Sequence, residues 1–151
     1  MLEPESVYSQ VGGTIQIRRV QKIFYDKIYA HPWLSRFFED IDQDLIESQQ
    51  TDFISKTLGG PSVYYGALPV PAHMHIRITG ELFDLRSQLL AESLREAGIP
   101  EEAAAIWLER DEAFRTRLVK GSRLECKKRY TTDEILDFPQ PESWPEGRQA
   151  G

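Results

Sequence analysis

The chain has 151 residues, of which 40% are hydrophobic and 28% are charged, a composition typical of a single globular domain. Its formal net charge of −6 at pH 7 is repelled by phosphate backbones and anionic lipids, so neither a nucleic acid nor a membrane is expected as a partner. The single cysteine excludes an internal disulfide, and the absence of a leader-like start or a long apolar run favours a cytoplasmic location.

The first half of the chain contains two stretches in which apolar residues recur at helical spacing. Residues 14–29 form the first stretch, and the Ala-His-Pro sequence that follows is expected to end the helix, because a residue before proline avoids helical geometry. A second helix is expected to begin near Asp42 or Asp44, either of which is a suitable N-cap. The Gly-Gly-Pro sequence at 59–61 is expected to end it.

The second half of the chain predicts two further helices. One covers residues 79–97, and the other begins at Pro100, a residue well suited to a first helical turn. The segment 62–73 contains two prolines and a glycine and is expected to be irregular. Only the sequence HIRIT at 75–79 alternates as a short strand would, so the predicted fold class is all-α. The buried side of the last helix is expected to comprise Ala103, Ile106, Trp107, Ala113, Phe114, Leu118 and Val119.

Polar side chains interrupt the apolar stripe of the second helix. The expected inward stripe consists of Leu45, Ile46, Gln49, Gln50, Phe53, Ile54 and Thr57. An unpaired buried amide costs about 1–3 kcal/mol, so Gln49 or Gln50, together with Tyr25 from the first helix, indicates a polar ligand inside an apolar pocket. The alternative is that both glutamines lie on a partly exposed helix edge and that Tyr25 only packs. The pattern alone leaves both interpretations open.

Two of the three histidines, His73 and His75, are separated by one residue. Neighbouring residues of a helix are rotated by about 100°, so helical positions two apart point to nearly opposite sides and do not hold one metal together. Structural zinc needs about four Cys or His ligands at suitable spacing, which the chain lacks. Heme iron needs only one histidine. A histidine without any metal role remains the alternative.

Several motifs, in order, resemble the truncated hemoglobins and most nearly their group I. They are YSQVGG at 8–13, FYDKIYAHPWLSRFF at 24–38, QQTDFISKTLGGPSVYYG at 49–66, AHMHIRIT with LFD, and LREAGIPEE. The resemblance covers residues 6–120. It implies a two-over-two helical sandwich around heme b, with a globin domain over 1–121. Residues 122–151 are then a C-terminal extension, partly helical or disordered, in which Thr131 and Glu134 have capping-box spacing.

The resemblance also implies roles for individual residues. His73 takes the position of the proximal iron ligand, with His75, which stands where the family usually has glycine, as the fallback. Tyr25 and Gln50 match the distal hydrogen-bonding residues. Ile46 stands where vertebrate globins have histidine, and Gln49 replaces a residue, often basic, that contacts a heme propionate, which leaves Arg77 as a substitute. The pocket wall implied by the family comprises Phe38, Phe53, Ile54, Leu58, Tyr64, Ile78 and Phe83.

The function implied by the resemblance is reversible binding of O₂, or of another diatomic gas such as NO or CO, at ferrous heme iron. Bound O₂ acquires negative character, so hydrogen-bond donors set in advance at its position stabilise it. The alternatives are a nitric oxide dioxygenase that depends on a reductase, a weak peroxidase, and a gas sensor or interaction module that uses the extension.

Overall fold

The computed structural model describes residues 6–61 and 68–141, and over these ranges the chain is helical and forms no strand. The elements in order are α1 (Val7–Val11), α2 (Gly13–Ala30), the 3₁₀ helix η1 (Leu34–Phe38), α3 (Gln43–Thr57), α4 (Pro69–His73), α5 (Gly80–Glu96), α6 (Glu101–Glu112), α7 (Arg115–Leu118) and the 3₁₀ helix η2 (Arg123–Glu125). The predicted all-α class is confirmed. Within the described ranges, none of the helices has the length and apolarity that a membrane span requires.

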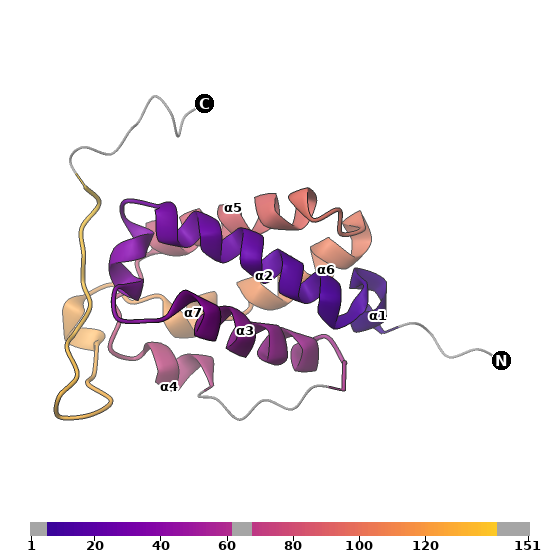
Figure 1. The fold of residues 1–151 in the computed structure, drawn as a ribbon. Helices are drawn as coiled ribbons and strands as arrows, with labels where there is room; N and C mark the ends of the chain where they lie inside the picture. The colour runs from indigo at the N-terminus through magenta and orange to yellow at the C-terminus, as the bar shows by residue number, and fades with distance from the viewer. Residues whose placement is uncertain (1–5, 62–67, 142–151) are drawn as a thin grey trace.

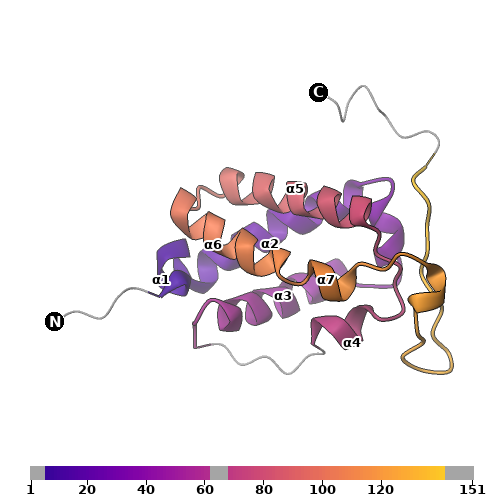
Figure 2. The same cartoon turned by 180° about the vertical axis from the view of Figure 1, so that it is seen from behind.

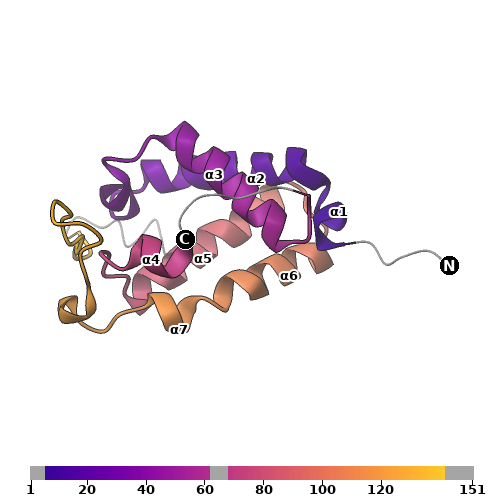
Figure 3. The same ribbon diagram turned by 90° about the horizontal axis from the view of Figure 1, so that it is seen from below.

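Helix α2 lies at the centre of the fold because one whole face of it is apolar. Ile17, Val20, Phe24 and Ile28 recur at helical spacing, and each is at most 3% exposed. Helix α2 packs beside α3 in one layer and against α5, which pairs with α6 in a second layer (Figures 1 and 3). Seen from behind, α6 and α7 follow one another along the second layer (Figure 2). The result is the two-over-two helical arrangement.

Side-chain caps decide where two of the helices begin. The carboxylate of Asp42 accepts a hydrogen bond from the backbone N–H of Leu45 at 2.9 Å, so Asp42 rather than Asp44 is the N-cap of α3. The hydroxyl of Thr79 accepts from the N–H of Leu82 at 3.1 Å and caps α5 in the same way. Both predicted helix starts are confirmed to within one residue.

The two Gly-Gly motifs of the sequence meet at Tyr8. Gly12 has a φ of 104°, a left-handed conformation that lets α1 turn directly into α2. The hydroxyl of Tyr8 lies 2.6 Å from that of Thr14, and its backbone N–H donates to the carbonyl of Leu58 at 2.9 Å. A Cβ atom added to Gly60 would lie 2.4 Å from the ring of Tyr8. Gly60 therefore allows the end of α3 to approach the aromatic ring.

Some predictions about local structure were wrong. Residues 69–73 of the supposedly irregular segment form helix α4, because proline at the first positions of a helix lacks only an N–H that would be unpaired anyway. The predicted last helix is divided into α6 and α7 at Ala113 and Phe114, and Ala113 is exposed. The capping box at Thr131 starts no helix; the helical turn in the described extension is η2, which Ser122 caps.

The described part of the extension, residues 122–141, packs on the loop that follows α4 (Figure 1). The N–H of Leu136 donates to the carbonyl of His75 at 2.9 Å, and the carbonyl of Leu136 accepts from the N–H of Arg77 at 2.8 Å. These two bonds form a parallel bridge beside Ile76, while a second bridge joins Ile78 to Val119. The alternating HIRIT sequence therefore pairs in single bridges rather than forming a strand.

The extension then reaches the corner that follows α2. The indole N–H of Trp33 donates to the carbonyl of Phe138 at 2.7 Å. The ring of Phe138 lies 5.0 Å from that of Phe37, and the guanidinium of Arg36 lies 4.1 Å from its centre. Residues 122–141 thus join the α4–α5 loop to the α2–η1 corner.

Candidate functional site

His73 is the last residue of α4, and its ring is held by a backbone carbonyl of the same helix. The Nδ1 atom lies 2.6 Å from the carbonyl oxygen of Pro69, so Nδ1 carries the proton and donates, and Nε2 keeps its lone pair. Burial lowers the pKa of His73 to about 4, although the Pro69 carbonyl acts in the opposite direction. A neutral imidazole with its other nitrogen bonded to a carbonyl is the form in which histidine ligates a metal.

The backbone around His73 is also held from outside. The ammonium of Lys120 donates to the carbonyl of His73 at 3.1 Å and to that of Ile76 at 2.8 Å. The backbone N–H of Lys127 donates to the carbonyl of Met74 at 2.8 Å. The backbone of residues 73–76 is therefore held by Lys120 and Lys127.

His75 faces the extension. Its side chain is 7% exposed, and its Nδ1 atom has no hydrogen-bond partner within the described residues. Burial lowers the pKa of His75, and the nearby Arg129 and Asp133 act on that pKa in opposite directions. The two histidines thus have different neighbours. Within the ranges 6–61 and 68–141 there is also no group of three or more His, Cys, Asp or Glu side chains suited to a metal ion.

Tyr25 lies on α2 in a ring of aromatic side chains. Its own ring is 6.0 Å from that of Phe38 and 5.0 Å from that of Phe24, and the residue is 7% exposed. Burial raises the pKa of Tyr25 well above its usual value, so the phenol keeps its proton as a hydrogen-bond donor. Neither the Tyr25 hydroxyl nor the half-buried Gln50 amide forms a hydrogen bond with another described residue.

Helix α3 buries two residues that the predicted inward stripe did not include, and two members of that stripe are exposed. Thr51 and Ser55 are fully buried, whereas Leu45 is 54% exposed and Gln49 is also exposed. The hydroxyl of Thr51 donates to the carbonyl of Glu47 at 2.7 Å, so its burial leaves no donor unpaired. Thr51 and Ser55 are small hydroxyl residues four positions apart, a spacing that indicates one helix face. A search for apolar residues alone did not detect this face. Ile46, Gln50, Phe53 and Ile54 flank this face and are half-buried.

The remaining predicted wall residues differ in their surroundings. Leu58 and Phe83 are 2% exposed, and Ile78 is half-buried beside Val119. The guanidinium of Arg77 donates to the carbonyl of Gly121 at 3.2 Å and lies 3.6 Å from the carboxylate of Asp137, so it faces the extension. Its contact with a heme propionate stays a prediction. Tyr64 lies outside the described residues.

Sequence reasoning missed an ion pair between α5 and α6. Arg86 donates to the carboxylate of Asp111 through both terminal nitrogens, at 2.6 and 2.8 Å. Arg86 recurs at helical spacing with Leu82 and Leu90, which are 4% and 2% exposed. A basic residue on an apolar stripe was therefore visible in the sequence.

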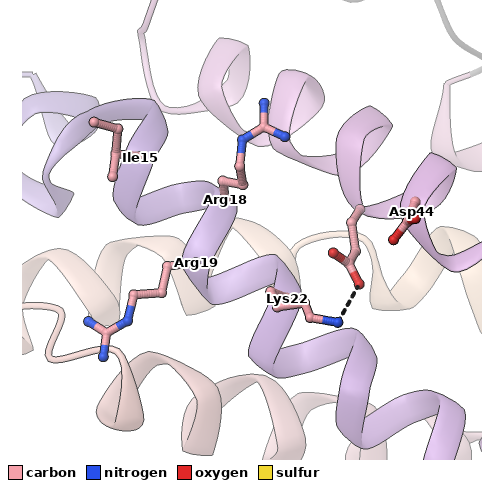
Figure 4. A pocket seen from close by; sticks show the side chains of 6 residues that line it. Ile15, Arg18, Arg19, Lys22 and Asp44 are labelled. Atoms are coloured by element: carbon pink, nitrogen blue, oxygen red, sulfur yellow. Dashed lines mark ion pairs between the residues drawn. The ribbon is translucent and has the colours of Figure 1, made fainter.

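A surface depression lies elsewhere, between α2 and the start of α3 (Figure 4). Its lining comprises Ile15, Arg18, Arg19, Lys22, Asp44 and Glu47. Lys22 and Glu47 approach to 4.0 Å across it, and Ile15 is 82% exposed. Since none of the candidate site residues lines it, this depression is separate from the candidate site.

Comparison with known proteins identifies the family. The family described as Bacterial-like globin matches residues 6–120. A group 1 truncated hemoglobin of Tetrahymena pyriformis is 33% identical over 99 residues, covering 66% of this chain and 82% of that protein. One from Mycolicibacterium paratuberculosis is 34% identical over 103 residues, covering 68% and 76%.

Solved structures agree with this match. The crystal structure of the Tetrahymena pyriformis truncated hemoglobin in its Fe(III) form matches with a TM-score of 0.68 and 29% identity, and the match covers 76% of this chain and 98% of that one. The group II truncated hemoglobin of Bacillus anthracis matches with a TM-score of 0.73 at 23% identity, which supports the fold alone. The chain therefore belongs to the truncated hemoglobins, a globin family that implies a heme cofactor and the binding of diatomic gases.

Proposed function

We propose that this protein binds heme b through His73 and reversibly holds O₂ or a related diatomic gas at ferrous iron. The observation that carries the proposal is the 2.6 Å contact between Nδ1 of His73 and the carbonyl of Pro69. This contact leaves Nε2 as the free nitrogen of a ring whose orientation is set by its own helix. The residues present therefore fit an axially ligated heme, which when bound supplies the iron centre that takes up the gas.

Tyr25 and Gln50 are the proposed polar groups opposite His73. Tyr25 comes from α2 and Gln50 from α3, the two helices of one layer, whereas His73 precedes α5 of the other layer. A buried phenol that keeps its proton donates to a ligand with negative character, and a half-buried amide adds a second donor. Phe38, Ile46, Phe53 and Ile54 would supply apolar surface around the macrocycle.

The test is the absorption spectrum of the purified, heme-supplied full chain. We expect a Soret band, a pyridine hemochrome of the heme b type, and a shifted band when CO is added to the ferrous protein. The same measurements on His73→Ala should show loss of the histidine-ligated ferrous spectrum. A full chain that takes up no heme from heme-supplied cells would overturn the proposal.

A gas sensor or interaction module is the second candidate, and one observation favours it. The extension bonds to the carbonyl of His75 and contacts the α4–α5 loop, so a change at the proximal side has a direct route to residues 122–141. Limited proteolysis of the extension in the unliganded and CO-bound ferrous protein tests this candidate. A ligand-dependent difference in cleavage supports it, and equal cleavage opposes it.

Two enzymatic activities are tested separately. Rapid consumption of NO by the oxygenated protein with a reductase would indicate a dioxygenase, and turnover of H₂O₂ would indicate a peroxidase.

A further inference from the structure

The guanidinium of Arg86 is held between α5 and α6 by an ion pair, although its side chain is 36% exposed. Both of its terminal nitrogens bind the carboxylate of Asp111, whose side chain is 11% exposed. The central carbon of the guanidinium lies 5.5 Å from the ring centre of Phe24 and 5.7 Å from that of Phe83. The ion pair is bidentate and lies near two aromatic rings. Because the guanidinium is planar, the two parallel hydrogen bonds restrict its orientation.

This charge lies near Tyr25, the proposed donor to the gas. The guanidinium lies 5.5 Å from the centre of the Phe24 ring, and the centre of that ring is 5.0 Å from that of Tyr25, so Phe24 lies next to both the ion pair and the phenol. Burial raises the pKa of Tyr25, and Arg86 opposes this rise more strongly than Asp111 supports it, so the arginine is the dominant charge at the phenol. Arg86 also contributes to the lowered pKa of His73, after burial.

The ion pair leaves part of the guanidinium unused. A guanidinium carries five N–H donors, and Asp111 accepts from one on each terminal nitrogen. Within the described residues, the other N–H groups of Arg86 form no hydrogen bond.

We propose that Arg86, positioned by Asp111, makes the gas site selective for small anionic ligands over neutral ones. The ligand class is monovalent anions of two or three atoms, such as cyanide and azide, in contrast to neutral CO. The selectivity arises because a fixed positive charge and unpaired N–H donors stabilise negative charge at the ligand and add little to the binding of a neutral molecule. This inference rests on the proposed binding of heme at His73.

The experiment compares ligand affinities in the heme-loaded full chain. Azide is titrated into the ferric protein and CO into the ferrous protein, each followed by the Soret band. The main variant is the double substitution Arg86→Leu with Asp111→Leu, which removes both charges together and so leaves neither one buried alone. We expect the azide affinity of this variant to fall by about tenfold or more, because the variant loses a charge-assisted hydrogen bond to the anion. CO affinity should change by less than about threefold.

Arg86→Lys is the second variant, which keeps the charge and needs no change in Asp111. We expect it to lose less azide affinity than the double variant, because an ammonium still supplies the charge and donors but not the two-pronged contact with Asp111. The proposal is overturned if azide binding is unchanged in the double variant, if CO and azide affinities fall equally, or if Arg86→Lys loses as much azide affinity as the double variant. A wild-type protein without a Soret band would show instead that the proposed heme function has failed.

Discussion

Nδ1 of His73 lies 2.6 Å from the carbonyl oxygen of Pro69, four residues earlier on the same short helix. This contact distinguishes His73 from His75, whose Nδ1 has no partner within the described residues and whose ring faces Arg129 and Asp133. It sets the tautomer and the direction of one imidazole before any metal binds. The two histidines, which are separated by one residue in the sequence, therefore have different surroundings.

Replacing each histidine by alanine tests that assignment. His73→Ala should lose the histidine-ligated ferrous spectrum, and added imidazole should restore it by occupying the vacated space. His75→Ala should keep the spectrum, because its ring faces the extension. Resonance Raman detection of the iron–histidine stretch in both variants provides the measurement. The opposite pattern, with loss only in His75→Ala, would show that His75 is the ligand.

The Tyr25 hydroxyl should slow the release of O₂. For Tyr25→Phe we expect O₂ dissociation to be faster by about tenfold or more, because a buried donor to a partly charged ligand is lost. Tyr29→Phe is the matched control, since the hydroxyl of Tyr29 already donates to the carbonyl of Ile41 at 2.8 Å. Stopped-flow displacement of O₂ by CO measures both rates. Equal rates in wild type and Tyr25→Phe would remove Tyr25 from the distal site.

The extension should contribute to stability and to heme retention. A chain ending at Gly121 loses the bond between Trp33 and the Phe138 carbonyl and the contact of Phe138 with Phe37. We expect the free energy of unfolding to fall by about 2–4 kcal/mol, the combined size of one buried hydrogen bond and one aromatic pair. Heme transfer to apomyoglobin should also be faster, because the α4–α5 loop loses its partners.

The control for that truncation is a chain ending at residue 141, which retains all the described contacts of the extension. Urea unfolding of the two truncated chains compares them directly. If both unfold at the same urea concentration as the full chain, residues 1–121 form a self-sufficient globin domain and the extension adds nothing to its stability. A selective loss in the shorter chain would make residues 122–141 part of the domain.

Gly60 should be intolerant of a side chain. In Gly60→Ala the new Cβ would meet the Tyr8 ring at 2.4 Å, so the helix end must move. We expect a loss of about 1–3 kcal/mol in the free energy of unfolding, the usual cost of overpacking. Gly80→Ala is the control, because no atom lies within 4 Å of its added Cβ, and we expect a change below about 1 kcal/mol. Similar values for the two variants in urea unfolding would contradict the close approach at Tyr8.

The local signals in the sequence predicted the helices well where one element alone determines them. The apolar spacing of α2, the Asp42 cap of α3 and the Thr79 cap of α5 depend on residues within a few positions of one another. The helical stripes pointed to Tyr25 and a glutamine as polar groups of a pocket, but their distal role and the proximal role of His73 came from motif order, because no local feature marks these residues as partners. Counting apolar residues missed the burial of Thr51 and Ser55 on α3, although Ile46 and Ile54 of the predicted stripe do pack against the core.

The sequence by itself thus determined the all-α class, most helix boundaries and the short list of candidate residues, since these depend on local periodicity and capping. Only the tertiary structure decided that Arg86 meets Asp111 and that Phe138 docks at Trp33 and Phe37. Arg86 and Asp111 are 25 residues apart in the chain, and Trp33 and Phe138 are 105 apart. Such pairs form only when packed helices bring distant residues together, so no local pattern encodes them.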